Sequence, residues 1–344
     1  MKRVWAFLLA LVLLFTTGCS STASKDEINT TRVDMLIACR DVNFQYGTQT
    51  DEHYEMLEKE EANQEIQELF WRLCDQENDY INEKYGLNFK SEHIPVYVID
   101  MNAADSVMSR NGLMQLYAAY IQSMNAVIIN KAYLESEVTD FFVGILAHEA
   151  GHYLYNENNG TNAFVLKDQN GGFLGMDITE GLNHKIILDF LEENYPKAYD
   201  NVKNTYLSNV LLCNMLECVI PDLDKLYLEN DIEAFCKAID DDVLTYTTAT
   251  TEVAKPSEYF MFQSTLMFYC ETLLLDDTRY EQATYGLYQY AIADFEIIYA
   301  MARDLPEAER EKLDKAYEEF VDKIFYGSVP EGLEEQLALL ENGE

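Results

Sequence analysis

Residues 138–155 read VTDFFVGILAHEAGHYLY, an apolar stretch that spans about five turns if it is helical. His148 and His152 stand four residues apart in it, and Glu149 lies between them. Residues four apart lie on one face of a helix, so both imidazoles can reach one zinc ion at about 2.0–2.1 Å. Glu149 flanks the same ion, where a carboxylate can take a proton from water. The pattern predicts a metal centre on this helix.

Short strands and one long helix are expected before this stretch. Residues 94–99, IPVYVI, are β-branched and aromatic, and Pro95 stands near the start, where its missing N–H matters least. Residues 116–121 and 126–130 predict two more strands joined by a short turn. Residues 51–85 lack Gly and Pro and carry apolar residues at helical spacing, which predicts one amphipathic helix.

After the histidine pair, the sequence predicts a loop and then helices. Residues 156–176 contain four glycines and separate the histidine helix from a second helix that runs from about 177 to 195. Helix follows helix beyond that point, with proline residues as punctuation. Because the strands are confined to the N-terminal half, the predicted class is α+β, with a small mixed sheet, the histidine helix and a mainly helical C-terminal half.

The composition narrows the classes of partner. The chain has 344 residues, with 24 Lys or Arg against 61 Asp or Glu, and a formal net charge of −37. Such a chain repels polyanions, which argues against nucleic acid as a partner. Hydrophobic residues make up 48% of the chain, more than a disordered acidic chain carries, so we expect a folded body with an acidic surface. The oligomeric state is not encoded in any pattern that we recognise.

The N-terminus has the layout of a secretory signal peptide. Lys2 and Arg3 precede an apolar run over residues 4–15, and small residues lead to Cys19. The run is 12 residues long, shorter than the roughly 20 that a membrane-spanning helix needs. No later stretch is predicted to span a membrane.

The small residues that end in Cys19 resemble the lipobox of bacterial lipoproteins. The resemblance implies that residues 1–18 are removed and that Cys19 becomes a lipidated first residue. Residues 19–25 would then tether the folded body to the extracytoplasmic face of the bacterial membrane. The alternative is an ordinary secreted protein with an incidental cysteine at this position.

The other six cysteines show no metal-binding spacing, because no C-x-x-C occurs. Scattered cysteines in apolar contexts are usually buried core residues, and we assign them no role. They are Cys39, Cys74, Cys213, Cys218, Cys236 and Cys270.

The His148-Glu149-Ala150-Gly151-His152 helix and the strand before it resemble the zincin metallopeptidases. In that family the strand just before the helix lies at the sheet edge, along the substrate cleft. The resemblance gives this place to residues 126–130, whose backbone could pair with a substrate by strand addition. Small residues such as Gly151 would allow close packing around the metal ligands.

A catalytic zinc needs a third protein ligand. Glu180-Gly181-Leu182 resembles the element that supplies this ligand in the gluzincin branch of the zincins, which implies that Glu180 binds the metal. Asp177 is the alternative ligand. Glu180 could instead serve as the third residue of a capping box at the start of the second helix.

His184 lies four residues after Glu180, where several gluzincins carry an acidic residue that orients a zinc histidine. A histidine there could bond to a substrate oxyanion, bind zinc as a fourth ligand and close the site, or face solvent. Gluzincins often use a Tyr or His from a later helix at the oxyanion, and Tyr246, Tyr259 and Tyr269 are candidates. His53 and His93 are expected at the surface.

These patterns and resemblances predict a lipid-anchored, extracytoplasmic zinc metallopeptidase that hydrolyses a peptide or protein substrate. Residues 26–195 would form the zincin-like part and residues 196–344 a helical subdomain. Zn²⁺ is the expected cofactor, held by His148, His152 and Glu180. Two alternatives stay open: a zincin-like surface lipoprotein that binds a partner through a closed or inactive zinc site, and a zinc hydrolase of a non-peptide envelope amide or ester.

Overall fold

The structure is a computed structural model that describes residues 58–100, 117–134, 139–161, 163–167, 173–247, 255–274 and 280–325. The predicted signal peptide, the tether and Cys19 lie outside these residues, as does His53. The division of the chain at residues 195 and 196 stays a prediction.

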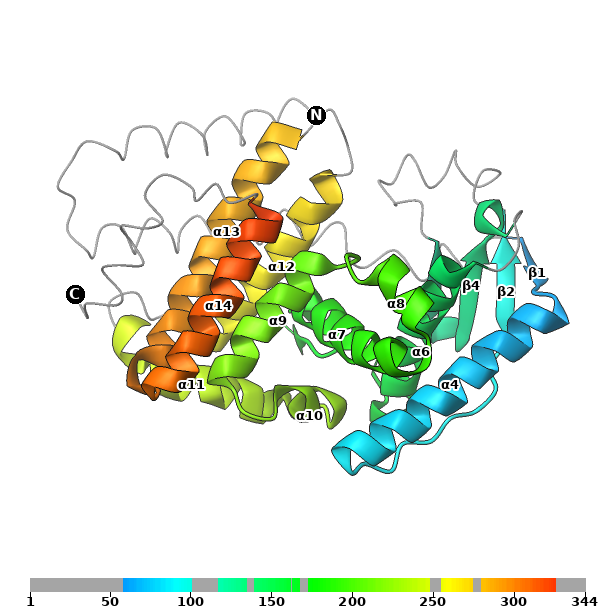
Figure 1. Ribbon diagram of the computed structural model, residues 1–344, viewed down its shortest axis with the longest axis horizontal. Coiled ribbons are helices and arrows are strands. Elements are labelled where there is room, and N and C mark those ends of the chain that lie inside the picture. The colour runs from blue at the N-terminus through cyan, green and yellow to red at the C-terminus, as the bar shows by residue number, and fades with distance from the viewer. Residues whose placement is uncertain are drawn as a thin grey trace.

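A four-stranded mixed sheet forms one end of the molecule, as Figure 1 shows. Its strands are β1 (Lys59–Glu61), β2 (Val96–Ile99), β3 (Ala118–Ile121) and β4 (Ala126–Asn130). The order across the sheet is β1-β2-β4-β3, in which β2 and β4 run parallel and the other neighbours antiparallel. The three strands expected at 94–99, 116–121 and 126–130 are confirmed, although residue 116 lies outside the described residues.

The expectation that residues 126–130 form the edge of the sheet is wrong. Strand β4 lies between β2 and β3, and all five of its residues are buried. A continuous apolar run such as AVIIN is typical of a strand covered on both faces and paired on both sides. Among the strands that the structure describes, β3 and β1 lie at the two ends of the sheet.

The single helix predicted over residues 51–85 is also corrected. Helix α4 (Gln64–Tyr85) begins only after Asn63, whose side chain accepts the Ile66 N–H at 3.0 Å. The three residues of β1 are exposed and pair with β2 instead of continuing the helix. They have no apolar side chain to bury, so backbone pairing with β2 overrides their helical propensity.

Helices make up most of the rest of the described fold, and the predicted α+β class is confirmed. They are α6 (Asp140–Asn159), α7 (Met176–Asn194), α8 (Pro196–Val202), α9 (Leu207–Val219), α10 (Leu223–Leu228), α11 (Ile232–Thr247), α12 (Pro256–Leu274), α13 (Tyr280–Met301) and α14 (Glu307–Ile324). Figure 1 places α6 to α9 between the sheet and the helices α11 to α14. Within the described ranges, no helix has the length and apolar character needed to cross a membrane.

The loop predicted over residues 156–176 is partly regular structure. Helix α6 continues to Asn159 and ends at Gly160, whose φ of 69° is a left-handed conformation that suits glycine. Two short strands, β5 (Leu166–Lys167) and β6 (Phe173–Leu174), then pair antiparallel. This pairing places β5 beside the segment that leads into α7. Residues 168–172, between the two strands, lie outside the description.

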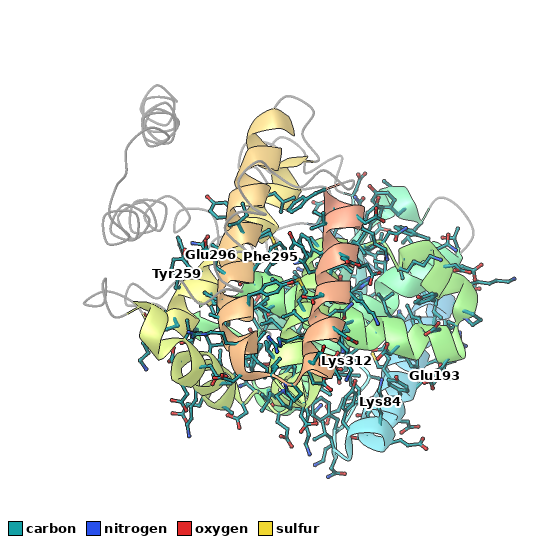
Figure 2. All side chains as sticks on the ribbon, turned by 60° about the vertical axis from the view of Figure 1, so that its left-hand side comes forward. Lys84, Glu193, Tyr259, Phe295, Glu296 and Lys312 are labelled. Carbon is teal, nitrogen blue, oxygen red and sulfur yellow. The ribbon has the colours of Figure 1, made fainter. Side chains whose placement is uncertain are left out.

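Aromatic packing joins the C-terminal helices. Phe295 points from α13 toward α14 (Figure 2), where its ring makes edge contacts with Tyr317 and Phe320 at centroid distances of 5.3 and 5.0 Å. Edge-to-face contacts of this kind add to the burial of the rings themselves. The C-terminal helices thus share one continuous hydrophobic core with the sheet and α4.

Candidate metal centre

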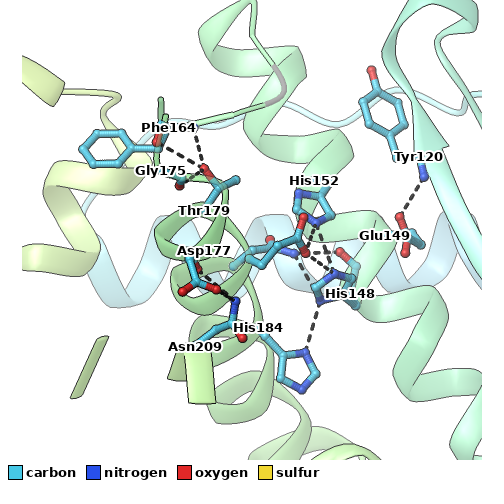
Figure 3. A network of polar contacts seen from close by, with 12 residues as sticks. Tyr120, His148, Glu149, His152, Phe164, Gly175, Asp177, Thr179, His184 and Asn209 are labelled. Atoms are coloured by element: carbon cyan, nitrogen blue, oxygen red, sulfur yellow. Dashed lines mark hydrogen bonds and ion pairs between the residues drawn. The ribbon is translucent and has the colours of Figure 1, made fainter. Parts of the chain in front are cut away.

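Helix α6 carries both histidines of the predicted metal centre. Thr139 caps the helix by accepting the Phe142 N–H at 3.2 Å. The rings of His148 and His152 lie one turn apart, with centroids 4.7 Å from each other and planes nearly perpendicular. Figure 3 shows both rings turned toward one carboxylate group in the space between α6 and α7.

That carboxylate belongs to Glu180 of α7. Its Oε2 atom lies 3.2 Å from Nε2 of His148 and 3.2 Å from Nε2 of His152, and the two Nε2 atoms are 3.1 Å apart. The ligand atoms of these three residues all lie within 4.8 Å of one another, so the group could hold a metal ion. The structure thus brings together the three residues that the sequence predicts as metal ligands.

The spacing of the three atoms fits a small tetrahedral cation. Zinc binds nitrogen and oxygen ligands at about 2.0–2.1 Å, and the edge of a tetrahedron is about 1.6 times the distance from its centre to a corner. Ligand atoms on one zinc ion are therefore about 3.3–3.4 Å apart. The observed 3.1–3.2 Å separations are close to this value.

Glu180 does not cap its helix. Helix α7 begins after Gly175 without a side-chain cap bond from its own N-terminal residues, and the carboxylate of Glu180 faces the histidines. The cap is supplied from α12, where Thr265 Oγ1 accepts the N–H groups of Gly175 and Met176. The capping-box interpretation of Glu180 is therefore wrong.

Gly151 allows α6 and α7 to approach each other at the site. A β-carbon at this position would collide with Oδ1 of Asn183 and lie 3.1 Å from the Ile187 side chain. Asn183 in turn donates through Nδ2 to the backbone carbonyl of His148 at 3.0 Å. The predicted role of Gly151 in close packing is confirmed, and the approach brings Glu180 within reach of the histidines.

Glu149 lies on the side of α6 that faces the sheet. Its Oε2 atom accepts the backbone N–H of Tyr120 in β3 at 2.7 Å, as Figure 3 shows. Burial raises the pKa of Glu149, and the neighbouring His148 and His152 oppose this shift. A carboxyl group with a raised pKa that adjoins a metal centre suits proton transfer near neutral pH.

His184 lies behind His148 and is buried, so the solvent-facing alternative is wrong. Its Nε2 lies 3.1 Å from the Val202 carbonyl oxygen, and its Nδ1 lies 3.1 Å from Nδ1 of His148. A carbonyl can only accept, so Nε2 of His184 carries the proton and Nδ1 is left as an acceptor. A neutral His148 then donates through Nδ1 and has Nε2 free of a proton, which is the form that binds metal.

The protonation of His184 agrees with this arrangement. Burial and the neighbouring His148 lower the pKa of His184 to about 3, so the ring is neutral at pH 7. Both of its nitrogens are engaged on the far side of His148 from Glu180. His184 therefore orients His148 and does not join the group of three.

The histidines and Glu180 attract one another without a metal. Burial alone would raise the pKa of Glu180, but His152 and His148 together hold it well below its usual value. Burial alone would lower the pKa of His152, and Glu180 and Glu149 outweigh that effect and raise it. A metal ion would compete with protons for the His152 ring, so metal affinity should increase with pH.

Asp177, the alternative ligand, does not belong to the cluster. Its carboxylate is bonded by the side chain of Asn209 in α9, and Figure 3 shows it turned away from the two histidines. Of the two residues that the sequence offers as a third ligand, Glu180 faces His148 and His152, and Asp177 does not.

No protein-family model, curated protein or solved structure matches this chain. The geometry of the site and the sequence patterns are therefore the basis on which a function can be argued.

One residue at the site was missed from the sequence. Tyr206, just before α9, stacks on the ring of His148 with a centroid distance of 4.7 Å and an angle of 11° between the planes. No motif marks this tyrosine, because its place depends on how the chain turns between α8 and α9. Of the predicted tyrosines, Tyr259 lies on α12 (Figure 2), and the side chains of Tyr246 and Tyr269 lie outside the description.

The remaining predicted residues behave as core or surface. His93 is exposed, as expected, and its ring stacks on Trp71 with centroids 4.6 Å apart. Cys74 and Cys213 are buried, and Cys218 and Cys236 are partly buried. All four are free thiols, while Cys39 and the side chain of Cys270 lie outside the description.

Proposed function

We propose that this chain is a zinc-dependent metallopeptidase of the zincin type. The observation that carries the proposal is the meeting of His148, His152 and Glu180 at tetrahedral spacing, with Glu149 beside them. A structural zinc site has no use for a carboxyl group placed to move a proton. The set of donors, two neutral imidazoles and one carboxylate, is typical of catalytic zinc sites that leave a fourth position for water.

His148, His152 and Glu180 would hold the zinc ion, with His184 orienting the first of them. Bound there, zinc would supply Lewis acidity toward a peptide carbonyl and make water a nucleophile at neutral pH. Glu149 accepts the proton of the attacking water and returns it to the leaving nitrogen. The Tyr120 N–H holds the carboxylate of Glu149 in place for both transfers.

The position of β3 favours a peptide substrate over other amides. Tyr120 belongs to this strand, which lies at the end of the described sheet, and its N–H is the group that contacts Glu149. An extended substrate could pair with such a strand through its backbone and carry its scissile bond past Glu149. Strand addition at β3 thus replaces the pairing with residues 126–130 that the sequence alone suggested.

We further propose that the enzyme acts outside the cytoplasm, held to the bacterial membrane by a lipid on Cys19. The support for this part is the sequence at residues 1–19, with its charged start, apolar run and terminal cysteine. Labelling of cells with a radioactive fatty acid would test it, since Cys19→Ser should abolish incorporation.

Zinc content and hydrolysis of an unfolded protein substrate, measured together on the purified full chain in detergent, test the catalytic proposal. We expect about one zinc per chain in the wild type and in Glu149→Gln, with activity reduced by at least about 10²–10⁴-fold in the variant. Glu180→Ala should lose both metal and activity. Glu157→Gln changes an exposed glutamate on the same helix and should retain both.

Two outcomes would contradict the proposal. If the wild type binds no zinc, the metal centre itself is wrong. If zinc is bound but Glu149→Gln is as active as the wild type, Glu149 is not the base and the peptidase mechanism fails.

A further inference from the structure

The turn between α8 and α9 has an unusual backbone at Tyr206. Its φ is 50° and its ψ 32°, in the left-handed region that L-residues with a bulky side chain rarely adopt. The other non-glycine residues with positive φ in the described ranges are Asn125, Asp222 and Asn230, whose short polar side chains tolerate this conformation. A tyrosine is the least suited of the four, so contacts of its side chain must compensate for the strain.

Two ring contacts of Tyr206 are with the linked histidines of the site. Its ring stacks on His148 at 4.7 Å and meets His184 at 5.5 Å with a tilt of 58°. The same turn supplies the Val202 carbonyl, which accepts from His184 and from the Thr205 N–H. The turn therefore contacts the face of the His148 ring through Tyr206, and it contacts Nε2 of His184 through the Val202 carbonyl.

The stacking of Tyr206 on the face of the His148 ring restricts a motion that the hydrogen bonds at the ring's edge leave free. His148 is held at Nδ1 by His184 and faces Glu180 and His152 through Nε2, and these contacts lie near the plane of its ring. They leave the ring able to tilt about the line through its two nitrogens. A tyrosine ring stacked on the face removes that freedom and fixes the direction of the Nε2 lone pair.

We propose that Tyr206 is a positioning residue for the metal ligand His148 and that its ring strengthens metal binding. This inference rests on the metal centre of the proposed function. A metal-bound imidazole is poor in electrons, and the face of a tyrosine ring is rich in them, so the stack is stronger when the metal is present. Because such coupling is reciprocal, the stack must raise the affinity for the metal by the same factor.

Zinc affinity, measured by competition with a chelating dye on the purified full chain, tests the proposal. Tyr206→Asn removes the ring and places a residue suited to positive φ, so the fold should be retained. We expect zinc binding about 10–100-fold weaker than in the wild type, the usual effect of losing a group that orients a ligand. Tyr206→Phe keeps the stack and should bind zinc within about threefold of the wild type.

The matched control is Tyr199→Ala. Tyr199 is a half-buried tyrosine on the neighbouring helix α8, seven residues earlier, and its removal should leave zinc affinity unchanged. The visible spectrum of the cobalt-substituted protein gives a second readout, because it reports the geometry of the ligands. It should change in Tyr206→Asn and stay the same in Tyr206→Phe and Tyr199→Ala.

Thermal unfolding in the presence of a chelator shows whether each variant is folded, and Tyr206→Gly replaces Tyr206→Asn if the latter is not. A folded variant without the ring that binds zinc as tightly as the wild type, with an unchanged cobalt spectrum, overturns the positioning role alone. If the wild type binds no zinc, the metal centre and this inference both fail.

Discussion

At the scale of single residues, His148 is the point where most contacts of the site converge. A histidine that binds metal through Nε2 needs a proton acceptor at Nδ1, and proteins commonly use a carboxylate or a carbonyl there. Here a second, neutral histidine intervenes, and its Nε2–H donates a hydrogen bond to the Val202 carbonyl. The chain of hydrogen bonds fixes the tautomers of both rings without a further carboxylate behind His148.

Replacement of His184 should therefore weaken metal binding without removing a ligand. We expect His184→Leu, which keeps much of the buried volume, to bind zinc about 10–100-fold more weakly than the wild type. Isothermal titration with zinc measures this, and unfolding in chelator checks that the variant is folded. His93→Leu removes an exposed histidine and serves as the control. Equal affinities of His184→Leu and the wild type would show that the contact with His148 is incidental.

At the scale of elements, the position of α7 is set by packing against several other helices. It carries Glu180 and packs on α6, α8, α9 and α12. The close approach to α9 occurs at Gly181, where a β-carbon would lie 2.6 Å from the Asn209 carbonyl oxygen and 2.6 Å from the Cys213 sulfur. The glycine that follows Glu180 thus allows close packing on α9, while Glu180 itself faces the histidines of α6.

Gly181→Ala separates packing from helical propensity. Propensity alone favours alanine inside a helix by about 1 kcal/mol. Because a β-carbon would meet the backbone of α9, we expect the variant to be less stable than the wild type by about 1–3 kcal/mol. Urea denaturation of the metal-free protein measures the difference. A more stable variant would mean that the two helices can move apart at little cost.

Thr265 links the C-terminal helices to the helix that carries Glu180, because its hydroxyl accepts two N–H groups at the start of α7 and donates to the Met261 carbonyl. Loss of such a cap costs about 0.5–2 kcal/mol. Thr265→Val should reduce the free energy of unfolding by this amount, and Thr265→Ser should retain it.

Ser264→Ala provides the comparison for Thr265. Ser264 is buried beside it and bonds only to a carbonyl of its own helix in the contacts described, so its loss should change stability by less than about 0.5 kcal/mol. Chemical denaturation of the three variants ranks them. If Thr265→Val unfolds no more easily than Ser264→Ala, the α12 hydroxyl does not support α7.

At the scale of the whole molecule, a buried acid makes folding depend on pH. Glu77 of α4 is fully buried, and neither oxygen of its carboxyl group has a hydrogen-bond partner among the described residues. Burial raises the pKa of Glu77 well above its usual value. The folded state therefore holds a proton that the unfolded state releases above about pH 4.3.

The sign of the effect follows from the proton count. Below about pH 4 both states carry the proton, and Glu77 does not affect stability. As pH rises, the unfolded state ionises and the folded state does not, so stability falls, by about 1.4 kcal/mol for each unit of the pKa difference. Glu77→Gln removes this titration and should stabilise the protein at pH 7 and not at pH 4.

Urea midpoints of the metal-free protein between pH 4 and 8 measure the predicted difference. Glu83→Gln, at an exposed position on the same helix, should follow the wild type at every pH. A constant difference between Glu77→Gln and the wild type over this range would show that Glu77 is ionised in the folded state.

Much of the fold could be predicted from the sequence, because in most elements the local pattern of apolar residues agrees with the tertiary packing. The histidine helix, the second helix and three of the strands have apolar spacing that matches the faces they bury. The prediction failed at residues 59–61 and over 126–130, where the partner decides the outcome. A charged segment became a strand because β2 offers backbone groups to pair with, and the edge position went to β3 and not to β4.

The sequence by itself determined which residues could form a metal centre, because a helix of fixed pitch places His148 and His152 on one face whatever surrounds it. Only the tertiary structure decided the rest. The choice of Glu180 over Asp177, the burial of His184 behind a ligand and the stacking of Tyr206 all depend on where α7, α8 and α9 lie against α6. Helical periodicity is local, whereas these contacts join residues that only the packing of separate helices brings together.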